Sequence, residues 1–545
     1  MITFMSGRRI AAIAGSAALL AGLGIAGATG PVRAAAATSP AIGSAKSGDL
    51  SSCRLGNGIK HVVQLTFDNV HFFRDNPNVP SDLQLMPNLL NFFENNGTFL
   101  SNDHTPLIAH TADDILTTYS GLYGDRQGMP ISNSYQAYNA DGTTDPAGSF
   151  AYWTDPVYDT AKTPNPGHDT NPNMVYSPVP PATAAAPVTP STVTPAPWVP
   201  YTRAGCNVGE VATANAELEN TAVDIPKVFG AGSPEDQQLT SDTDSFKDQE
   251  NNDYVGIGVH CAKGSAFCAG ATAVKFGQTS PSKTAIADLL PDEPGGYTGY
   301  QALFGHKYVA PQLGAGTPNL MAGSYQVTNA AGNLVDLNGN EIDGQYVHTP
   351  GFPGYGPINA SQTLAYMADM LGSGVQVVNG YIADVHGNQN IPGVAACKGA
   401  PSALGSGTAC YIAQAQAYNQ AFGTFFARLA AMGITSANTL FVLSSDEGDH
   451  EAGANVGRAI QPTPATCDGV TVPCTYPAGS FGELGGNLTG LLATQKNNTT
   501  PFTLESDTAP EVYVNGNPGP AEFGPSAESE PSRPRCLTPG PTKPA

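Results

Sequence analysis

The stretch IKHVVQLTFDN, residues 59–69, decides which fold class the chain can adopt. Its apolar residues follow one another almost without interruption, and the run ends at Asp68 and Asn69. Near-continuous apolar runs are typical of parallel strands covered on both faces, whereas strands with one wet face alternate apolar and polar residues. The stretch therefore predicts a buried parallel strand that ends in an acid.

Two later stretches repeat this pattern. Apolar runs in VQVVNGYIADVHGNQN, residues 375–390, and in NTLFVLSSDEGDH, residues 438–450, also end in aspartate. We predict a helix before each of them, over 361–374 and over 411–432, and the second has apolar residues every three or four positions. Because strand and helix alternate, we expect an α/β fold with a mostly parallel central sheet sandwiched by helices.

The chain between these strands differs in composition. Residues 131–360 include a Pro/Ala/Thr-rich connector, 177–200, that cannot hold regular structure. We interpret 131–360 as a large, loop-rich insertion between two parts of one α/β core, 38–130 and 361–515. The Pro-rich residues 516–545 have the composition of a disordered tail.

Residues 1–37 have the pattern of an export signal. Arg8 and Arg9 precede an apolar stretch, and small residues near Ala35 to Ala37 offer cleavage sites. The apolar stretch is a little shorter than the ~20 residues that span a bilayer. We expect cleavage, no membrane span afterwards, and a secreted or periplasmic protein. A retained membrane anchor is the alternative.

The net charge restricts which partners the protein can bind, and the cysteine content bears on disulfide formation. The formal net charge of −22 argues against nucleic acid or an anionic membrane as a bulk partner, but not against a small phosphorylated substrate held through cations. Nine cysteines in an exported chain predict disulfides. The short-range candidates are Cys261/Cys268, Cys397/Cys410 and Cys467/Cys474, which leaves Cys53, Cys206 and Cys536, one of them free or paired elsewhere.

Three aspartates, Asp68, Asp384 and Asp446, each follow a predicted strand. Functional residues of an open α/β sheet collect at the carboxyl ends of its strands. Three carboxylates at that edge would repel one another unless cations lay among them. Each acid alone could be a solvated loop residue. Together with His386 and His450, they predict a metal site.

Several stretches of the sequence resemble motifs from two branches of one enzyme superfamily. Thr111 followed by SGLYGDRQG, residues 120–128, resembles the nucleotide pyrophosphatase/phosphodiesterase branch of the alkaline phosphatase superfamily, where a nucleophilic threonine precedes TGLYP-x-x-HG. The opening IKHVVQLTFDN is similar to the phospholipase C/acid phosphatase branch, with Asp68 and Asn69 in place of its Glu-Asn pair. The segment SSDEGDH has features of both branches.

The resemblance implies an alkaline-phosphatase-like fold and a metal-dependent phosphoester hydrolase, either a phosphodiesterase or a phosphatase. Two divalent cations (Zn, Mg, Mn or Ca) would activate the hydroxyl of Thr111, which would form a phospho-threonine intermediate. Thr111 also begins a predicted helix, so a role as N-cap is a compatible alternative. The implied metal ligands are Asp68, Thr111 and Asp446 for one cation and Asp384, His386 and His450 for the other. Glu447 is expected to be an extra oxygen ligand. Asn69, Asp114 and Arg126 are the expected substrate-binding residues, and a surface salt bridge is the alternative for Arg126.

The chain also departs from the family pattern. Asp114 stands where a phosphate-binding asparagine is usual, and Glu447 replaces a histidine, which shifts the preference toward oxygen-binding cations. The Asp384-x-His386 spacing is tighter than usual, and no histidine follows His450. These departures leave a second hypothesis from another class, a non-catalytic secreted binding protein on a degenerate scaffold.

Overall fold

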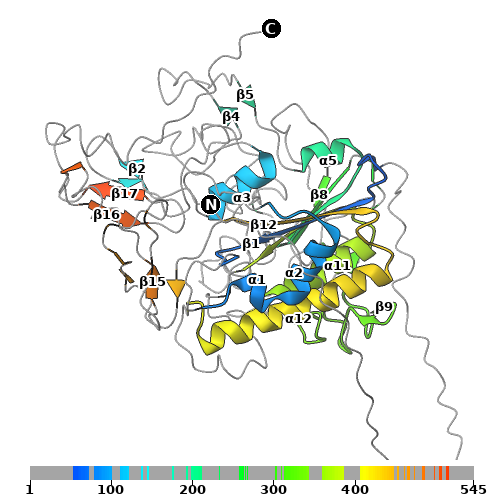
Figure 1. The fold of residues 1–545 in the computed structure, drawn as a ribbon. Helices are drawn as coiled ribbons and strands as arrows, with labels where there is room; N and C mark the ends of the chain where they lie inside the picture. The colour runs from blue at the N-terminus through cyan, green and yellow to red at the C-terminus, as the bar shows by residue number, and fades with distance from the viewer. Residues whose placement is uncertain are drawn as a thin grey trace, which may run out of the picture. The chain divides into compact units, whose positions relative to one another are not determined.

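The computed structural model (Figure 1) covers the chain unevenly. It describes residues 53–72, 79–100, 111–121, 198–211, 257–262, 312–342, 359–383 and 405–446, with short strands and single residues elsewhere. All of them belong to one unit, Ser39–Ala545. The export signal and the tail lie outside the described residues, so both remain predictions. None of the helices that the structure describes has the length and apolar character of a bilayer-spanning segment.

A mixed, mostly parallel sheet forms the centre of the fold. Its strands, in spatial order, are β12 (Thr439–Ser445), β1 (His61–Phe67), β11 (Val377–Ile382), β6 (Val208–Val211), β7 (Ile257–Cys261) and β8 (Gln301–Leu303). The first four strands are parallel; β7 is antiparallel to β6, and β8 is antiparallel to β7. The three strands predicted to end in acid are therefore neighbours, and the predicted α/β class is confirmed.

Helices precede the strands where the sequence predicts them. The described helices are α1 (Asp82–Leu85), α2 (Pro87–Asn96), α3 (Thr111–Ser120), α5 (Val199–Arg203), α11 (Ala360–Gly372) and α12 (Ala409–Ala431). Asn359 caps the start of α11 through the backbone N–H of Gln362, and Thr408 caps α12 through that of Tyr411. Gly433, with φ of 78°, follows the end of α12. Figure 1 shows α1, α2, α11 and α12 together along one side of the sheet.

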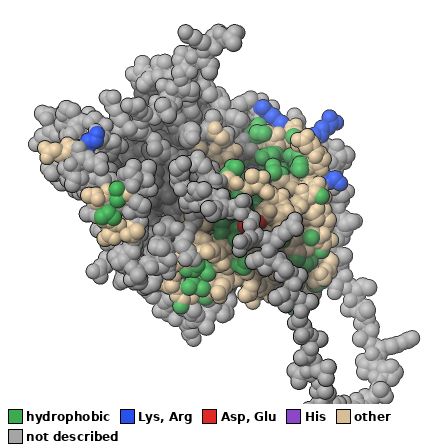
Figure 2. Space-filling model, viewed as in Figure 1, with side chains coloured by type: hydrophobic (Ala, Val, Ile, Leu, Met, Phe, Trp, Pro, Cys, Tyr) green, Lys and Arg blue, Asp and Glu red, His purple; other side chains and the backbone are tan. Residues whose placement is uncertain are grey.

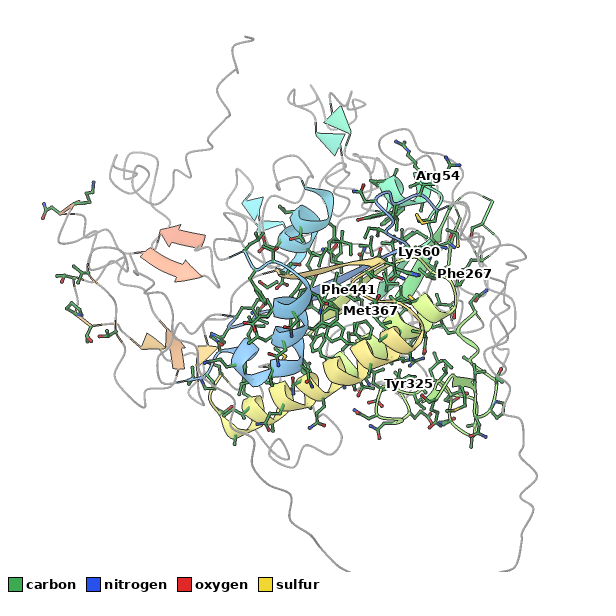
Figure 3. The ribbon with its side chains drawn as sticks, turned by 45° about the vertical axis from the view of Figure 1, so that its right-hand side comes forward. Arg54, Lys60, Phe267, Tyr325, Met367 and Phe441 are labelled. Atoms are coloured by element: carbon green, nitrogen blue, oxygen red, sulfur yellow. A yellow bond between two sulfur atoms is a disulfide. The ribbon has the colours of Figure 1, made fainter. Side chains whose placement is uncertain are left out.

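Close packing joins these helices to the sheet. Phe67 of β1 stacks on Phe422 of α12, with ring centroids 5.7 Å apart. Met367 of α11 lies against Gly380 of β11 (Figure 3), so closely that a Cβ at position 380 would be 3.2 Å from the Met367 Cγ and nearer still to its sulfur. Only glycine leaves this space for the methionine. The face of the sheet that carries Phe67 and Gly380 is therefore the apolar face.

A buried ion pair connects the two long helices. Arg428 of α12 donates to the carboxylate of Asp369 of α11, and both side chains are almost completely buried. The ring of Tyr325 lies 5.6 Å from the Arg428 guanidinium carbon (Figure 3) and brings a short hairpin onto the pair. Burial raises the pKa of Asp369 to about 6, although Arg428 opposes this shift. The ion pair therefore connects α11 to α12, and the Tyr325 ring adds the hairpin to this contact. Removal of one partner would leave an uncompensated buried charge.

Short strands make up the remaining regular structure that is described. They are β9 (Met321–Ala322) with β10 (Tyr325–Gln326); β13 (Glu451–Ala452), β15 (Gly482–Leu484) and β14 (Ala459–Ile460); β16 (Phe502–Glu505) with β17 (Glu511–Val514); β2 (Ala137–Tyr138) with β3 (Thr144–Asp145); and β4 (Val175–Tyr176) with β5 (Thr192–Val193). The prediction that the connector 177–200 holds no regular structure is wrong near its end, where β5 and the start of α5 lie. Pro200 suits the first turn of α5, because a backbone N–H needs no helical partner there. The 131–360 region also supplies β6, β7 and β8, so part of it is built into the central sheet. Its short strands lack the long apolar run that marks β1.

One disulfide joins two segments that are far apart in the chain. Cys53, ahead of β1, is bonded to Cys206, ahead of β6, across 153 positions. These are two of the three cysteines that the short-range pairs leave over. Cys261 and Cys410 are disulfide-bonded as well. The disulfide fixes the amino ends of β1 and β6 relative to each other.

Substitution of Gly380 tests the contact between α11 and the sheet. Gly380→Ala should lower the free energy of unfolding by about 1–2 kcal/mol, because the added methyl group displaces Met367 from a filled space. Met367→Ala alone should cost about 2–5 kcal/mol through the cavity that it leaves. The double variant should lose less than the sum, since the new Cβ then enters that cavity. Urea unfolding of the four proteins measures this, and strict additivity would contradict the packing described.

A buried histidine gives the fold a dependence on pH. His260 of β7 stacks on Trp198, with ring centroids 3.8 Å apart and the planes 1° from parallel. Complete burial lowers the pKa of His260 from 6.5 to about 3. The ring therefore stays neutral in the folded protein at a pH where it becomes protonated in the unfolded chain. Its contribution to stability is full above pH 6.5 and is lost progressively as the pH falls toward 3.

His260→Phe should remove this dependence while keeping the stack on Trp198. Between pH 7 and pH 5 the wild type should lose about 2 kcal/mol more unfolding free energy than the variant, because only its unfolded chain gains a proton at position 260. Urea unfolding at the two pH values measures the difference. Parallel pH curves for the two proteins would show that folding does not lower the pKa of His260.

Candidate functional site

Two of the predicted ligands lie side by side at the carboxyl edge of the sheet. Asp68 follows β1 and Asp446 follows β12, and the parallel register places Phe67 opposite Ser445 at the end of both strands. The backbone N–H of Asp446 donates to the carbonyl of Phe67 at 2.9 Å, and that of Asp68 donates to the carbonyl of Ile382 in β11 at 3.0 Å. Hydrogen bonds of the sheet itself therefore hold both acids at this edge.

A strained residue connects the two acids. Asn69 has φ of 32°, in the left-handed region that residues other than glycine rarely adopt. In this conformation its backbone N–H donates to Oδ1 of Asp446 at 3.3 Å. Asparagine tolerates the left-handed region better than most side chains. Backbone strain of this kind concentrates at functional sites, which makes Asn69 part of the candidate site on structural grounds as well.

Both acids are withdrawn from bulk water. Asp446 is fully buried and Asp68 is 9% exposed. In Figure 2, correspondingly, very little acidic surface is visible among the described residues on the face shown. Two buried carboxylates so close together need hydrogen-bond donors or cations to offset their repulsion. Their oxygens are the hard donors that Mg²⁺, Mn²⁺ and Ca²⁺ prefer, so the pair fits one side of the predicted metal site.

Hydroxyl groups lie next to the acids on the face of the sheet opposite Phe67. Tyr381 of β11 donates a hydrogen bond to Oδ2 of Asp68. Thr66 of β1 is hydrogen-bonded to the hydroxyl of Tyr119 at 3.1 Å and to that of Ser444 at 3.4 Å. We call Thr66, Tyr119, Tyr381 and Ser444 the hydroxyl layer.

The same face stays polar further along the sheet. Asn379 of β11 donates to the carboxylate of Glu210 in β6 at 3.0 Å, and both side chains are buried. Burial and, to a smaller extent, Glu210 raise the pKa of Tyr201 in α5, so α5 approaches this side. One face of the sheet thus packs apolar side chains against α11 and α12, and the other carries hydrogen-bonded polar groups.

Helix α3 begins at the predicted nucleophile. Thr111 is its first residue, although its side chain lies outside what the structure describes. Asp114 and Ile115, in the first turns, are fully buried. Tyr119, two turns after Thr111, ties α3 to β1 through the hydroxyl layer. The predicted start of this helix is confirmed, and an acid in its first turn stabilises the positive end of the helix dipole.

The other predicted site residues fall outside the described part of the chain. They are Asp384, His386, Glu447, His450 and Arg126. Among the described residues, no group of three or more His, Cys, Asp or Glu could hold a metal ion. Four of the seven predicted ligands are not among those residues, so the complete metal site stays a prediction.

Sequence reasoning missed Tyr381 and Tyr119. Tyr381 lies three residues before Asp384, and strand alternation alone could have placed it on one face of the sheet. The hydrogen bond from Tyr381 to Asp68 depends on the register of β1 with β11, in which Thr66 lies opposite Tyr381. Local sequence does not encode that register.

Comparisons with protein-family models, with curated proteins and with solved structures found no match for the chain. The alkaline phosphatase superfamily is therefore suggested only by the resemblance of the sequence motifs. The arrangement of Asp68, Asn69 and Asp446 at the edge of the sheet is an observation independent of those motifs.

Two substitutions of Asn69 separate its backbone role from its side-chain role. Asn69→Ala should lower the free energy of unfolding by about 1–2 kcal/mol, because alanine resists the left-handed conformation. Asn69→Gly should be nearly as stable as the wild type, since glycine adopts this conformation freely and keeps the N–H that binds Asp446. Chemical unfolding distinguishes them, and equal stabilities would show that the strain is absent.

Proposed function

We propose that the chain is an exported, metal-dependent phosphoester hydrolase, a phosphatase or a phosphodiesterase, that uses Thr111 as its nucleophile. The observation that carries this proposal is the adjacency of Asp68 and Asp446 at the carboxyl ends of two parallel strands, connected through the backbone of Asn69. Buried carboxylates paired at such an edge are a common basis for a cation site in α/β proteins. The motif order in the sequence supports the assignment of the reaction.

The proposed metal ligands fall into two sets. Asp68, Asp446 and Thr111 would hold one divalent cation, and Asp384, His386 and His450 would hold the other, while Glu447 would add an oxygen ligand. When bound, the cations would lower the pKa of the threonine hydroxyl and neutralise charge on the phosphoryl oxygens. Oxygen ligands dominate the first set, so magnesium, manganese or calcium suits it, whereas the two imidazoles of the second set would also accept zinc.

Residues of the chain would orient the reaction. The first turn of α3 has backbone N–H groups without partners inside the helix, which together with the helix dipole favour a phosphoryl group beside Thr111. The Tyr119–Thr66 hydrogen bond holds α3 against β1, and Asn69 holds Asp446. The threonine oxygen would bond to phosphorus as the bond to the leaving alkoxide breaks. Water would then cleave the phospho-threonine and restore the hydroxyl.

The substrate would be a small phosphate ester rather than a nucleic acid. A formal net charge of −22 repels a polyanion, whereas cations in the site would attract a single phosphoryl group. Asn69 and Arg126 are the proposed contacts with it. Asp114 is fully buried in α3. It would influence binding of the phosphoryl group by its effect on the electrostatics of the first helical turn.

A secreted binding protein on a degenerate scaffold is the second candidate, and Asp114 favours it. An acid in the first turn of α3 occupies the place where the related enzymes carry a donor to phosphate, and it lowers the affinity of that turn for an anion. Such a protein would keep the fold and would show no turnover.

Thr111→Ala tests the nucleophile. With p-nitrophenyl phosphate and bis-p-nitrophenyl phosphate as substrates, kcat should fall on the order of 1,000-fold or more, because the attacking oxygen is removed. Thr111→Ser keeps a hydroxyl and should retain part of the activity. Full activity of Thr111→Ala would overturn the mechanism.

Metal analysis distinguishes the two candidates. The purified wild type, dialysed in metal-replete buffer, should contain two equivalents of divalent metal by mass spectrometry, and Asp68→Asn should contain less. A protein with no bound metal and no turnover would be the binding protein instead.

A further inference from the structure

We infer that Tyr381 is a positioning residue for Asp68: its phenol holds one carboxylate oxygen and so fixes the direction in which Asp68 meets its cation. This inference rests on the proposed function, because it concerns the same site. No motif in the sequence assigns Tyr381 a role.

The side chain of Tyr381 can act in this way because it is itself held rigidly. It lies on β11, a central strand between β1 and β6, and is only 4% exposed. Its carbonyl accepts a hydrogen bond from the Thr363 hydroxyl of α11 at 3.0 Å, which connects its backbone to the neighbouring helix. The phenol then donates to Oδ2 of Asp68. A donor that does not move removes the rotational freedom of the carboxylate.

The Tyr381 hydroxyl is a suitable hydrogen-bond donor to orient Asp68 as a metal ligand. A hydrogen bond from a hydroxyl to a carboxylate is stronger than one between two neutral groups, so it constrains the direction of the carboxylate. Asp68 lies beside the buried Asp446, whose Oδ1 accepts a hydrogen bond from the backbone N–H of Asn69, so each of the two acids has a donor of its own. Loss of a hydrogen-bond partner that orients a metal ligand typically weakens metal binding by about 10- to 100-fold.

The chain contains a matched control for this contact. Tyr411 of α12 donates to Oδ1 of Asp82 at 2.8 Å, and the backbone N–H of His71 donates to Oδ2 of Asp82 at 2.7 Å. This is again a buried tyrosine on a buried aspartate, but Asp82 is not among the proposed ligands. A substitution at Tyr411 reproduces the loss of stability without touching the site.

The experiment measures Mn²⁺ binding to the purified full-length chain by titration calorimetry. Tyr381→Phe should weaken Mn²⁺ binding by about 10- to 100-fold and alter the electron paramagnetic resonance spectrum of the bound ion, because the carboxylate is no longer held. Tyr411→Phe should leave both unchanged. In turnover, Tyr381→Phe should lower kcat at saturating substrate when Mn²⁺ is not saturating, and excess Mn²⁺ should restore part of the loss.

Two outcomes overturn the inference in different ways. If the wild type binds Mn²⁺ and Tyr381→Phe binds it equally well, Tyr381 is structural and the proposed function stands. If the wild type binds no Mn²⁺, the proposed function fails and this inference fails with it.

Further variants cover additivity and folding. In an Asp68→Asn background, Tyr381→Phe should have no further effect on Mn²⁺ affinity, since Tyr381 acts through Asp68; an additional loss would contradict this. If Tyr381→Phe does not fold, Thr363→Val loosens the backbone of Tyr381 and should cause a smaller loss of affinity, whereas wild-type affinity in that variant would overturn the inference.

Discussion

Parallel pairing of β1 with β12 on one side and with β11 on the other determines where the acids of the site lie. In parallel strands all carboxyl ends reach the same edge, so residues that follow different strands become neighbours. Asp68 and Asp446 are almost 400 positions apart, yet backbone hydrogen bonds at the end of the sheet place them together. The pairing also brings Tyr381 opposite Thr66, within reach of Asp68.

The two faces of this sheet serve different purposes. On the face of Phe67 and Gly380, apolar side chains pack tightly against α11 and α12. On the other face, Thr66 is hydrogen-bonded to Tyr119 and Ser444, and Asn379 is separately hydrogen-bonded to Glu210. Buried polar groups are costly unless each has a partner, so such a network tolerates few alternative arrangements. The apolar face stabilises the fold, and the polar face gives the acidic edge a fixed geometry.

Long-range connections make the sheet a rigid support. The Cys53–Cys206 disulfide joins the amino ends of β1 and β6, opposite the edge that carries the acids. The Asp369–Arg428 pair fixes α11 against α12, and Thr363 of α11 is bonded to the backbone of Tyr381. A site that must orient a metal ligand depends on such support, because small displacements of a ligand weaken binding.

The sequence by itself determined the strand at 59–69, the acids that end β1 and β12, and the start of α3 at Thr111. These features follow from local signals: apolar runs, caps and helical periodicity act over a few residues and need no distant partner. Tertiary structure alone decided the order of the strands, the inclusion of β6, β7 and β8, the left-handed conformation of Asn69 and the bond from Tyr381 to Asp68. Each of these depends on which distant strand pairs with which, and at what register. A hydroxyl and a carboxylate 313 positions apart become partners only when that register is set.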